Sequence, residues 1–414
     1  MNSLTQLGIN AKTAARSLGL ASSPLKNDAL LAVAKALRLS SDEIINENQK
    51  DLNEARKNGT SSAMLDRLML DEKRISAMSE GIITLTKLDD PVGKILNETV
   101  RPNGIKITKI SCPMGVIGII YEARPNVTAD AAAIALKSGS AVILRGGKEA
   151  INSNKKIVEI MRCAIASVGI DENAIQLVTD TSRQSATDLM TLNGYLDVLI
   201  PRGGAGLIKA AVENSTVPVI ETGTGNCHAF VDKTADISMA IEIVFNGKVQ
   251  RPSVCNALES LLVHKDIAEN ALPKICSKLK AAGVKIIGCE KTVDILPYAT
   301  LASENDFATE FLDYKISVKI VDDIDDAINH ISKYSTHHSE VIITESSENA
   351  AKFTTAIDSA AVYVNASTRF TDGGEFGLGA EIGISTQKLH ARGPMGLDEL
   401  TSYKYIISGN GQIR

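Results

Sequence analysis

The chain has 414 residues, which is more than one hydrophobic core usually supports, so two or three domains are expected. Apolar residues make up 44% and charged residues 22%, a balance typical of a globular protein, and no apolar run is long enough to span a membrane. The net charge of -5 leaves no basic surface field, which argues against nucleic acid as a partner.

The first part of the chain, from about Leu4 to Leu88, is predicted to be helical. Asp28–Arg38 carries apolar residues at helical spacing, and Ser41–Glu43 supplies a capping residue and acids for the start of the next helix. A turn at Pro102–Gly104 leads into Ile105–Cys112, where apolar and polar residues alternate as in a strand. A helical layer followed by an extended segment is therefore expected.

The middle of the chain alternates strands with helices. Tryptophan is absent and aromatic residues are only 4%, so the core must consist of Ile, Leu, Val and Ala, which suits helices packed on a parallel sheet. The predicted strands are Val116–Tyr121, Ala141–Leu144, Ile175–Thr179, Leu196–Ile200 and Pro218–Ile220. The predicted helices are Ala129–Lys137, Ile151–Ser167, Arg183–Leu192 and Gly206–Glu213. This order predicts a doubly wound parallel sheet.

A second α/β series is predicted from about Ala235 onward. Its helices are Ile237–Val249, Ala268–Ala282 and Ile324–Lys333. Its strands are Leu258–Val263, Val284–Gly288, Ser317–Val321, Val341–Thr344 and Ala361–Val364. No internal repeat or low-complexity linker is visible, so the boundary between the two series depends on topology alone.

Glycine-rich loops follow two of the predicted strands and open helices. One contains Arg145 and Lys148, and the other contains Gly203, Gly204 and Gly206. Glycines let backbone N–H groups approach a phosphate at a helix N-terminus, and the two cations would suit the extra phosphate of NADP. The spacing differs from the G-x-G-x-x-G fingerprint, so ordinary turns with solvated cations are an equally good interpretation.

The cysteines lie scattered and contain no C-x-x-C pair, which predicts neither a zinc framework nor a disulfide scaffold. Free thiols fit a reducing cytoplasm, where we expect this protein. Five of them are expected to be buried and inert: Cys112, Cys163, Cys227, Cys276 and Cys289. Cys255 differs, because it follows Arg251-Pro252 in a polar loop, and a nearby guanidinium lowers a thiol pKa. Cys255 is therefore the candidate nucleophile, with an inert cysteine as the alternative.

Two other groups of polar residues have both a functional and a plain interpretation. Glu221, in a third glycine-rich segment, follows a predicted strand where open α/β sheets place ligands, although a surface acid in a turn fits equally. His330, His337 and His338 have no acidic or cysteine ligand at a suitable spacing, so a hydrogen-bonding role is favoured over metal binding. No metal site is expected.

Several segments match a known family in order along the chain. They are Pro113–Gly118, Gln250–Asn256, a spaced pattern from Val321 to Ile342 that includes His330 and His338, Val364–Gly374 and Gln387–Pro394. On these segments the chain resembles the aldehyde dehydrogenase superfamily, from about Leu4 nearly to its C-terminus. The spaced pattern is similar to that of the branch that reduces an acyl phosphate.

The resemblance implies an α/β, aldehyde dehydrogenase-like fold with two doubly wound, Rossmann-like α/β domains and a small β bridging element. Residues 1–225 would form an NADP-binding domain, in which 98–112 is the bridging hairpin. Residues 226–399 would form the catalytic domain that carries Cys255. Residues 400–414, with a strand around Tyr403–Ile407, would complete the bridging element, which makes dimers or tetramers in this family.

The same resemblance implies roles for individual residues. Cys255 lies where the family keeps its nucleophile, and Glu221 corresponds to a glutamate that activates water or the thiol in hydrolytic relatives, although the following Thr222–Thr224 departs from their pattern. Asn126 is the candidate side-chain donor to the oxyanion, in a register made uncertain by the departure at Arg124–Asn126. Candidate cofactor contacts are Arg145, Lys148 and Glu310, and candidate groups for the leaving phosphate are Arg251, Arg369 and Ser253.

The reaction implied is the NADPH-dependent reduction of L-glutamyl 5-phosphate to L-glutamate 5-semialdehyde and phosphate, a step of proline biosynthesis. The acyl phosphate is labile, so functional coupling to the upstream glutamate 5-kinase is conceivable. Two alternatives stay open: a relative that hydrolyses its thioester or passes it to coenzyme A, and a binding or scaffold protein that keeps the fold. A phosphate requirement in the reverse reaction separates the first, and absence of NADPH binding would favour the second.

Overall fold

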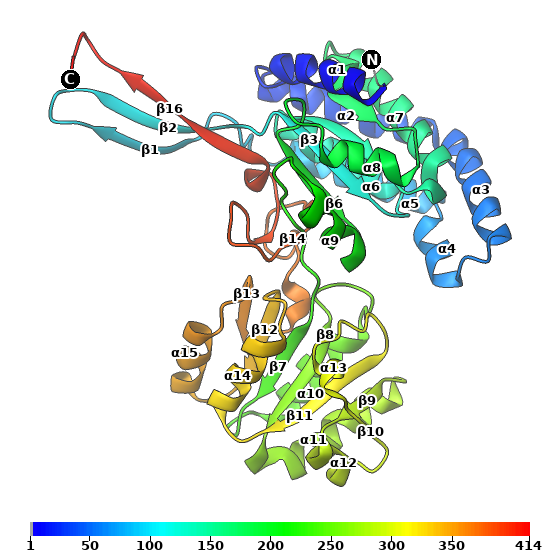
Figure 1. Cartoon of the computed structure of the whole chain (residues 1–414), viewed down its shortest axis with the longest axis vertical. Coiled ribbons are helices and arrows are strands. Elements are labelled where there is room, and N and C mark those ends of the chain that lie inside the picture. Colours follow the sequence, from blue (N-terminus) through cyan, green and yellow to red (C-terminus); the bar gives the residue numbers. More distant parts are fainter. Residues whose placement is uncertain (1–2) are drawn as a thin grey trace. The chain divides into compact units, whose positions relative to one another are not determined.

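The computed structural model describes residues 3–414 and divides them into two compact units (Figure 1). The first unit contains the described residues up to Thr222 together with 377–383 and 395–414, and the second contains Gly223–Phe376 and Ile384–Pro394. The boundary expected at residue 225 thus lies close to Thr222. Residues 377–383 and 395–399, expected in the catalytic domain, group instead with the first unit.

The first unit begins with the predicted helical layer: α1 (Ser3–Leu18), α2 (Ser23–Leu39), α3 (Ser41–Lys57), α4 (Ser62–Leu68) and α5 (Glu72–Thr86). Side-chain caps begin several of these helices, because an oxygen of Ser22 accepts from the Leu25 N–H, and Asp71 caps α5 through the Arg74 N–H. Helix α2 buries Leu30, Val33 and Leu37 and packs against α5 and α7 (Ile151–Ala166).

A parallel sheet of four strands in the order β5-β4-β3-β6 forms the centre of this unit. Its strands are β3 (Val116–Tyr121), β4 (Ala141–Arg145), β5 (Ile175–Leu177) and β6 (Val198–Arg202), and its further helices are α6 (Asn126–Lys137), α8 (Arg183–Met190) and α9 (Ala205–Asn214). The predicted strand Pro218–Ile220 is wrong, since this segment makes only an isolated bridge between Val219 and Leu199. The chain leaves β3 toward β5 and returns to β6 on the other side, so the topological switch point lies between β3 and β6.

The second unit is built on a parallel sheet of seven strands in the order β10-β9-β11-β8-β7-β12-β13. The strands are β7 (Cys227–Val231), β8 (Leu258–His264), β9 (Lys285–Gly288), β10 (Thr300–Leu301), β11 (Lys315–Val321), β12 (Ser339–Ile343) and β13 (Ala361–Val364). The helices are α10 (Ile237–Val249), α11 (Lys265–Ala281), α12 (Glu290–Ile295), α13 (Glu304–Phe307), α14 (Ile324–Tyr334) and α15 (Ser347–Ala356). The expected start of this series near Ala235 is wrong, because β7 precedes it and lies inside the sheet.

Both faces of this sheet are buried. Ala229 and Val231 of β7 point into a core formed with α10 and α11, whereas Phe230 points to the opposite face, where it packs against Phe353 of α15. Strand β8 alternates in the same way, with Leu261 on the first face and Leu262 on the second. Burial on both sides explains why the strands carry adjacent apolar residues, such as Leu261, Leu262 and Val263 of β8, instead of a strict alternation with polar residues.

A separate antiparallel sheet in the order β1-β2-β16 belongs to the first unit. It joins β1 (Ile95–Val100) and β2 (Lys106–Pro113) to β16 (Thr401–Ser408), so the expected hairpin and C-terminal strand do pair (Figure 1). Strands β1 and β16 are almost wholly exposed, with apolar side chains such as Ile95, Tyr405 and Ile407 on their surface.

The remaining elements are short. They are β14 (Ile384–Ser385), β15 (Gly393–Pro394) and the 3-10 turns η1 (Lys148–Ala150), η2 (Glu172–Ala174), η3 (Thr368–Phe370) and η4 (Asp398–Leu400). Across residues 3–414, no helix is both long and apolar enough to cross a membrane.

A buried carboxylate joins the helical layer to the sheet domain. Asp51 on α3 is 3% exposed, and its Oδ2 accepts hydrogen bonds from the Ser153 N–H at 2.9 Å and the Ser153 hydroxyl at 2.6 Å. The carboxylate thus satisfies donors in the first turn of α7, where a negative charge is also favoured by the helix dipole.

We expect Asp51→Ala to lower the free energy of unfolding by about 3 kcal/mol, because buried donors lose a charged acceptor. Urea unfolding followed by circular dichroism measures the change. Asp28→Ala, which removes an exposed carboxylate from α2, is the matched control and should change stability by less than about 0.5 kcal/mol. Equal effects of the two substitutions would contradict this role of Asp51.

Candidate active site

Cys255 lies in the loop Gln250–Asn256, called the Cys255 loop, which joins the end of α10 to the start of β8. Its side chain is half-buried, and a turn closed by the Ala257 N–H on the Val254 carbonyl at 3.1 Å leads directly into β8. The loop therefore holds Cys255 at the amino end of β8. Segments before β7, β11 and β12 contact this region, so the cluster forms along the amino edge of the sheet.

Gly225 brings a second segment against this loop. A Cβ atom built on Gly225 would lie 1.5 Å from the Cys255 carbonyl oxygen and 2.8 Å from its Cα. Only a residue without a side chain fits at such a distance, so the backbones of Gly225 and Cys255 are in direct contact. Gly225 belongs to the third glycine-rich segment noticed in the sequence, and its role is close packing against Cys255.

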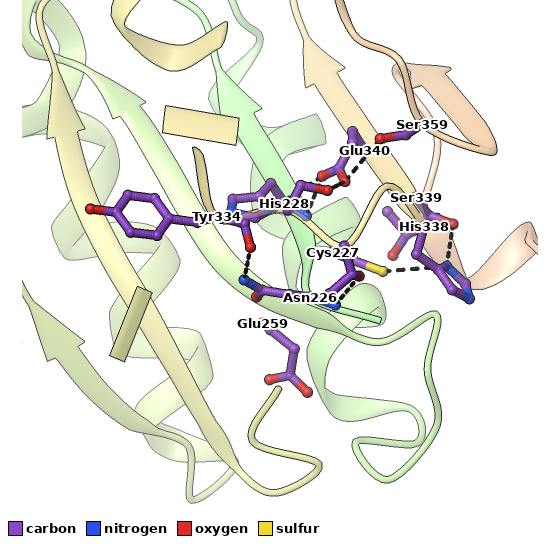
Figure 2. Close-up of polar contacts among 12 residues, drawn as sticks. Asn226, Cys227, His228, Glu259, Tyr334, His338, Ser339, Glu340 and Ser359 are labelled. Carbon is purple, nitrogen blue, oxygen red and sulfur yellow. Dashed lines mark hydrogen bonds and ion pairs between the residues drawn. The ribbon is translucent and has the colours of Figure 1, made fainter. Parts of the chain in front are cut away.

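A buried thiol lies under the Cys255 loop. Cys227, the first residue of β7, donates from Sγ to the Cys255 carbonyl at 3.2 Å, and its Sγ is 3.7 Å from Nδ1 of His338 (Figure 2). Burial raises the pKa of Cys227 well above its usual range. Cys227 therefore stays a protonated donor that fixes the loop, and His338 continues the chain of contacts to the Ser339 hydroxyl at 2.8 Å.

Asn226 anchors the Gly225 segment from the other side. Its side-chain amide donates to the Tyr334 carbonyl at 2.8 Å (Figure 2). The amide also donates to the Phe307 carbonyl at 2.8 Å, and the backbone N–H donates to the Thr336 hydroxyl at 2.9 Å. The Thr336 hydroxyl in turn donates to the Thr224 carbonyl at 2.6 Å. The segment that contains Gly225 and Asn226 is therefore held by contacts with three separate stretches of the chain.

Two buried histidines, His228 and His338, make polar contacts in the second unit, whereas His337 is exposed. His228 and Glu340 lie 3.1 Å apart between neighbouring strands, and Glu340 Oε2 also accepts the His228 N–H at 2.8 Å (Figure 2). Burial lowers the pKa of His338 to about 4, so this side chain is neutral. Within residues 3–414, no cluster of three or more His, Cys, Asp or Glu side chains is arranged to hold a metal ion.

Glu310 lies in the second unit and contacts the same segment. Its Oε1 accepts the Gly225 N–H at 2.7 Å, and burial raises its pKa. Glu310 is therefore joined through Gly225 to the backbone of Cys255. Sequence reasoning singled out Glu310 only through the family pattern, because nothing in its local sequence indicates this contact.

The segment around η3 places Arg369 beside the Cys255 loop. Arg369 Nε donates to the Gln250 side chain at 3.0 Å, and the Thr368 hydroxyl donates to the Asn256 carbonyl at 2.7 Å. Burial lowers the pKa of Arg369, and the positive charge of Arg251 lowers it further. Arg251 is exposed and Ser253 half-buried in the loop itself, so the two arginines and Cys255 belong to one cluster.

Apart from Glu310, the residues expected to contact a cofactor lie at the carboxyl edge of the sheet in the first unit. Arg145 ends β4, and its Nη2 donates to the carbonyls of Thr181 at 2.9 Å and Ser182 at 2.8 Å. Its Nε is buried with no partner among the described residues, and Lys148 is exposed in η1. Arg145 is thus partly occupied by backbone, whereas Lys148 faces solvent.

Gly203 and Gly204 lie between β6 and α9, and Gly206 lies in the first turn of α9. A Cβ on Gly203 would lie 2.7 Å from the Glu122 carboxyl carbon, and the Gly204 N–H donates to Glu122 Oε2 at 3.1 Å. The N-terminus of α9 at the switch point therefore binds an anionic group, here a carboxylate. The exposed backbone at these glycines fits a dinucleotide phosphate, which would replace that carboxylate.

Asn126 and Glu221 belong to the first unit, whereas Cys255 belongs to the second. Asn126 begins α6 and its amide donates to Asp130 Oδ2 at 3.0 Å, so this side chain already has a partner one turn along the helix. Glu221 is half-buried in the segment between the Val219 bridge and the end of the first unit. The structure therefore brings Cys255, Glu310, Arg251, Arg369 and Ser253 together in one unit.

The expectation that the other cysteines are buried is correct for Cys227 and Cys276 only. Cys112 and Cys289 are half-buried, and Cys163 on α7 is exposed. None of the six cysteines is in a disulfide. Exposure alone therefore does not distinguish Cys255, whose distinguishing feature is the set of contacts made by its loop.

Comparison with known proteins agrees with this arrangement of two α/β units. A model of the aldehyde dehydrogenase family matches residues 9–308. An acetylating aldehyde dehydrogenase from Geobacillus thermoglucosidasius, only 16% identical, has the same fold with a TM-score of 0.69 over 100% of both chains. The chain therefore belongs to the aldehyde dehydrogenase family and is an oxidoreductase, and the fold expected from the sequence is confirmed.

Its full-length relatives are more specific. The chain is 59% identical over 413 residues to gamma-glutamyl phosphate reductase of Clostridium perfringens and 58% identical over 414 residues to that of Carboxydothermus hydrogenoformans, with 100% of each chain covered. The crystal structure of gamma-glutamyl phosphate reductase from Thermotoga maritima matches with a TM-score of 0.98 and 48% identity over 100% of both chains.

We expect Gly225→Ala to lower the oxidoreductase activity by about 100-fold or more, because displacement of a reacting group by about 1 Å has that effect. The new methyl group would overlap the Cys255 carbonyl and push the loop away. Gly81→Ala on α5 is the control, since a Cβ there meets nothing within 4 Å, and it should retain activity. Full activity of Gly225→Ala would show that the Cys255 loop tolerates the shift.

The neutral His338 makes stability depend on pH. The unfolded chain binds a proton on this histidine near its ordinary pKa of 6.5, whereas the folded chain does so only near pH 4. Above about pH 6.5 the histidine is neutral in both states and does not reduce the free energy of unfolding. As the pH falls toward 4, the unfolded chain binds the proton first, so the free energy of unfolding decreases.

Between about pH 7 and pH 5 this histidine should remove about 2 kcal/mol from the free energy of unfolding. We expect His338→Asn to flatten the dependence of stability on pH by that amount, measured by urea unfolding at both pH values. His337→Asn, at the exposed neighbouring position, should leave the slope unchanged. A slope in His338→Asn equal to that of the unsubstituted chain would refute the assignment.

Proposed function

We propose that this chain reduces L-glutamyl 5-phosphate to L-glutamate 5-semialdehyde and inorganic phosphate, with NADPH as the hydride donor and a thioester on Cys255 as the intermediate. The observation that carries the proposal is the constrained Cys255 loop. Gly225 and Cys227 both contact the backbone of Cys255, while the Cys255 side chain is only half-buried. The names of its full-length relatives support the choice of substrate.

The first step is an attack by the Cys255 thiolate on the acyl carbon, which forms the C–S bond and a tetrahedral oxyanion. The nearby guanidinium groups of Arg251 and Arg369 favour the thiolate form of Cys255. The Cys255 backbone N–H is the proposed donor to the oxyanion, together with the Asn126 amide. That amide would have to turn from Asp130 to do so.

Phosphate leaves when the oxyanion collapses, so the C–O bond to the phosphoryl group breaks and the thioester remains. Arg251, Arg369 and Ser253 are the proposed partners of the leaving phosphate, because guanidinium groups form paired, charge-assisted hydrogen bonds with phosphate oxygens. The Gln250 contact holds Arg369 toward the loop that carries Cys255. An acyl phosphate is already activated, so no water-activating base is required, and Glu221 is assigned a supporting role.

The cofactor site proposed in the first unit consists of Arg145, Lys148, Gly203, Gly204 and Gly206, and Glu310 of the second unit is the proposed partner of the nicotinamide ribose. Bound NADPH would supply the hydride that reduces the thioester carbon. Lys148 is the better candidate for the ribose phosphate, because two backbone carbonyls already occupy Arg145. The resulting thiohemiacetal then releases the aldehyde and restores the Cys255 thiolate.

Further parts of the proposal concern the assembly and its surroundings. The apolar, exposed strands β1 and β16 support a homo-oligomer, dimer or tetramer, in which the three-stranded sheet is the bridging element. Six free cysteines support a reducing cytoplasm. Functional coupling to glutamate 5-kinase would protect the labile acyl phosphate between the two enzymes.

The decisive experiment is the reverse reaction, the oxidation of glutamate 5-semialdehyde with NADP. We expect this oxidation to require inorganic phosphate and Cys255→Ala to lower its rate by about 10⁴-fold or more. Cys163→Ala, at the exposed cysteine of α7, is the control and should keep full activity. Substantial activity of Cys255→Ala would overturn the covalent mechanism, and oxidation without phosphate would point to a hydrolytic enzyme instead.

A further inference from the structure

A buried ion pair lies directly behind the Cys255 loop. Lys248 in the last turn of α10 and Glu259 near the start of β8 lie 2.6 Å apart, and both side chains are 0% exposed. The two residues flank the Cys255 loop in the sequence, so the pair closes the base of that loop. Sequence reasoning assigned neither residue a role.

Glu259 makes a second contact that leaves the loop. Its Oε1 accepts the Leu312 N–H at 3.1 Å, while Oε2 binds Lys248 (Glu259 is labelled in Figure 2). Leu312 has φ of 52°, in the left-handed region that is unfavourable for non-glycine residues. Such a conformation persists only when neighbouring groups hold it.

Leu312 follows Glu310 closely, and this closes a ring of contacts. Glu310 accepts a hydrogen bond from the Gly225 N–H at 2.7 Å, and Gly225 is in direct contact with the backbone of Cys255. From Cys255 the ring therefore runs through Gly225, Glu310, Leu312 and Glu259 and back to the Cys255 loop. Three of its links are contacts between described residues of the second unit, and the links from Glu310 to Leu312 and from Glu259 to the loop run along the chain.

Stability alone does not account for this pair. Taking two charges out of water costs several kcal/mol per ion, and well-packed apolar residues of similar size are often as stabilising. Burial raises the pKa of Glu259 and lowers that of Lys248, which reflects this cost. An apolar pair would fill the space, but it would leave the Leu312 N–H without its acceptor.

We propose that Lys248 and Glu259 are positioning residues. Through the hydrogen bond to the Leu312 N–H, they fix the position of the Glu310 carboxylate relative to the Cys255 loop. This inference rests on the proposed function in one respect, namely that Glu310 binds the cofactor. Glu259 supplies the acceptor, and Lys248 keeps that carboxylate oriented. The nucleophile and the ribose contact are thereby held by one rigid connection.

Two double variants separate positioning from space filling. Lys248→Met with Glu259→Gln removes both charges but keeps an oxygen that accepts from Leu312, whereas Lys248→Met with Glu259→Leu removes the acceptor as well. Thermal melting first establishes that both are folded. Glu242→Leu with Lys278→Met is the matched control, because that pair joins α10 and α11 at the surface.

Hydrogen exchange without cofactor and steady-state kinetics are then measured for each variant. We expect the Leu-containing double variant to exchange about tenfold faster in residues 307–314 and to raise the KM for NADP about tenfold, the effect of one hydrogen bond. The surface control should stay within about twofold of the unsubstituted chain. The Gln-containing variant should fall between the control and the Leu-containing variant, because it keeps the acceptor but loses the lysine that orients it.

Equal exchange in the two double variants would overturn the inference, because the pair would then only fill space. Faster exchange of residues 307–314 with an unchanged KM for NADP would support the connection between Glu259 and the Leu312 segment, but it would refute the cofactor role proposed for Glu310. A rise in KM with unchanged exchange would also overturn the inference, since the kinetic effect would not arise from the Leu312 contact.

Discussion

The contact between the backbones of Gly225 and Cys255 is the constraint on which the site depends. Strands β7 and β8 are neighbours in the sheet, so the segments that precede them meet at its amino edge. No side chain fits between them, and the thiol of Cys227 donates to the Cys255 carbonyl. The loop consequently has little freedom to move, which is what a nucleophile requires for a defined line of attack.

Sequence patterns predicted most of the fold because they report local preference and burial. The N-terminal helices, strand Val116–Tyr121 and helix Ile237–Val249 lie where periodicity places them. Strand β7 was missed because it is short and directly follows a glycine-rich segment, so no turn separates it from the loop. The prediction of a strand at Pro218–Ile220 was wrong because this segment makes one isolated bridge in place of a full ladder of hydrogen bonds, and only Ile220 in it is buried.

The candidate site was predictable only in part. Cys255 could be singled out because a proline and an arginine before it mark a polar loop, and the family pattern supported that choice. The supporting residues Cys227 and Glu259 could not, because they resemble ordinary core positions in strands. Their importance comes from partners far away in the sequence, such as Leu312 for Glu259, and only the packed chain brings these together. The rule that ligands bind at carboxyl edges fits the first unit, whereas the cysteine cluster of the second unit lies at an amino edge.

The discontinuous first unit has a consequence for synthesis on the ribosome. Its sheet β1-β2-β16 pairs strands that are about 300 residues apart in the chain, and residues 377–383 return to the same unit. Strand β2 therefore emerges with one edge unpaired and stays so until β16 is made, long after the second unit can begin to fold. An open edge with apolar side chains is a template for pairing between nascent chains. Pairing with β16 thus covers an edge of β2 that stays open through the synthesis of the whole second unit.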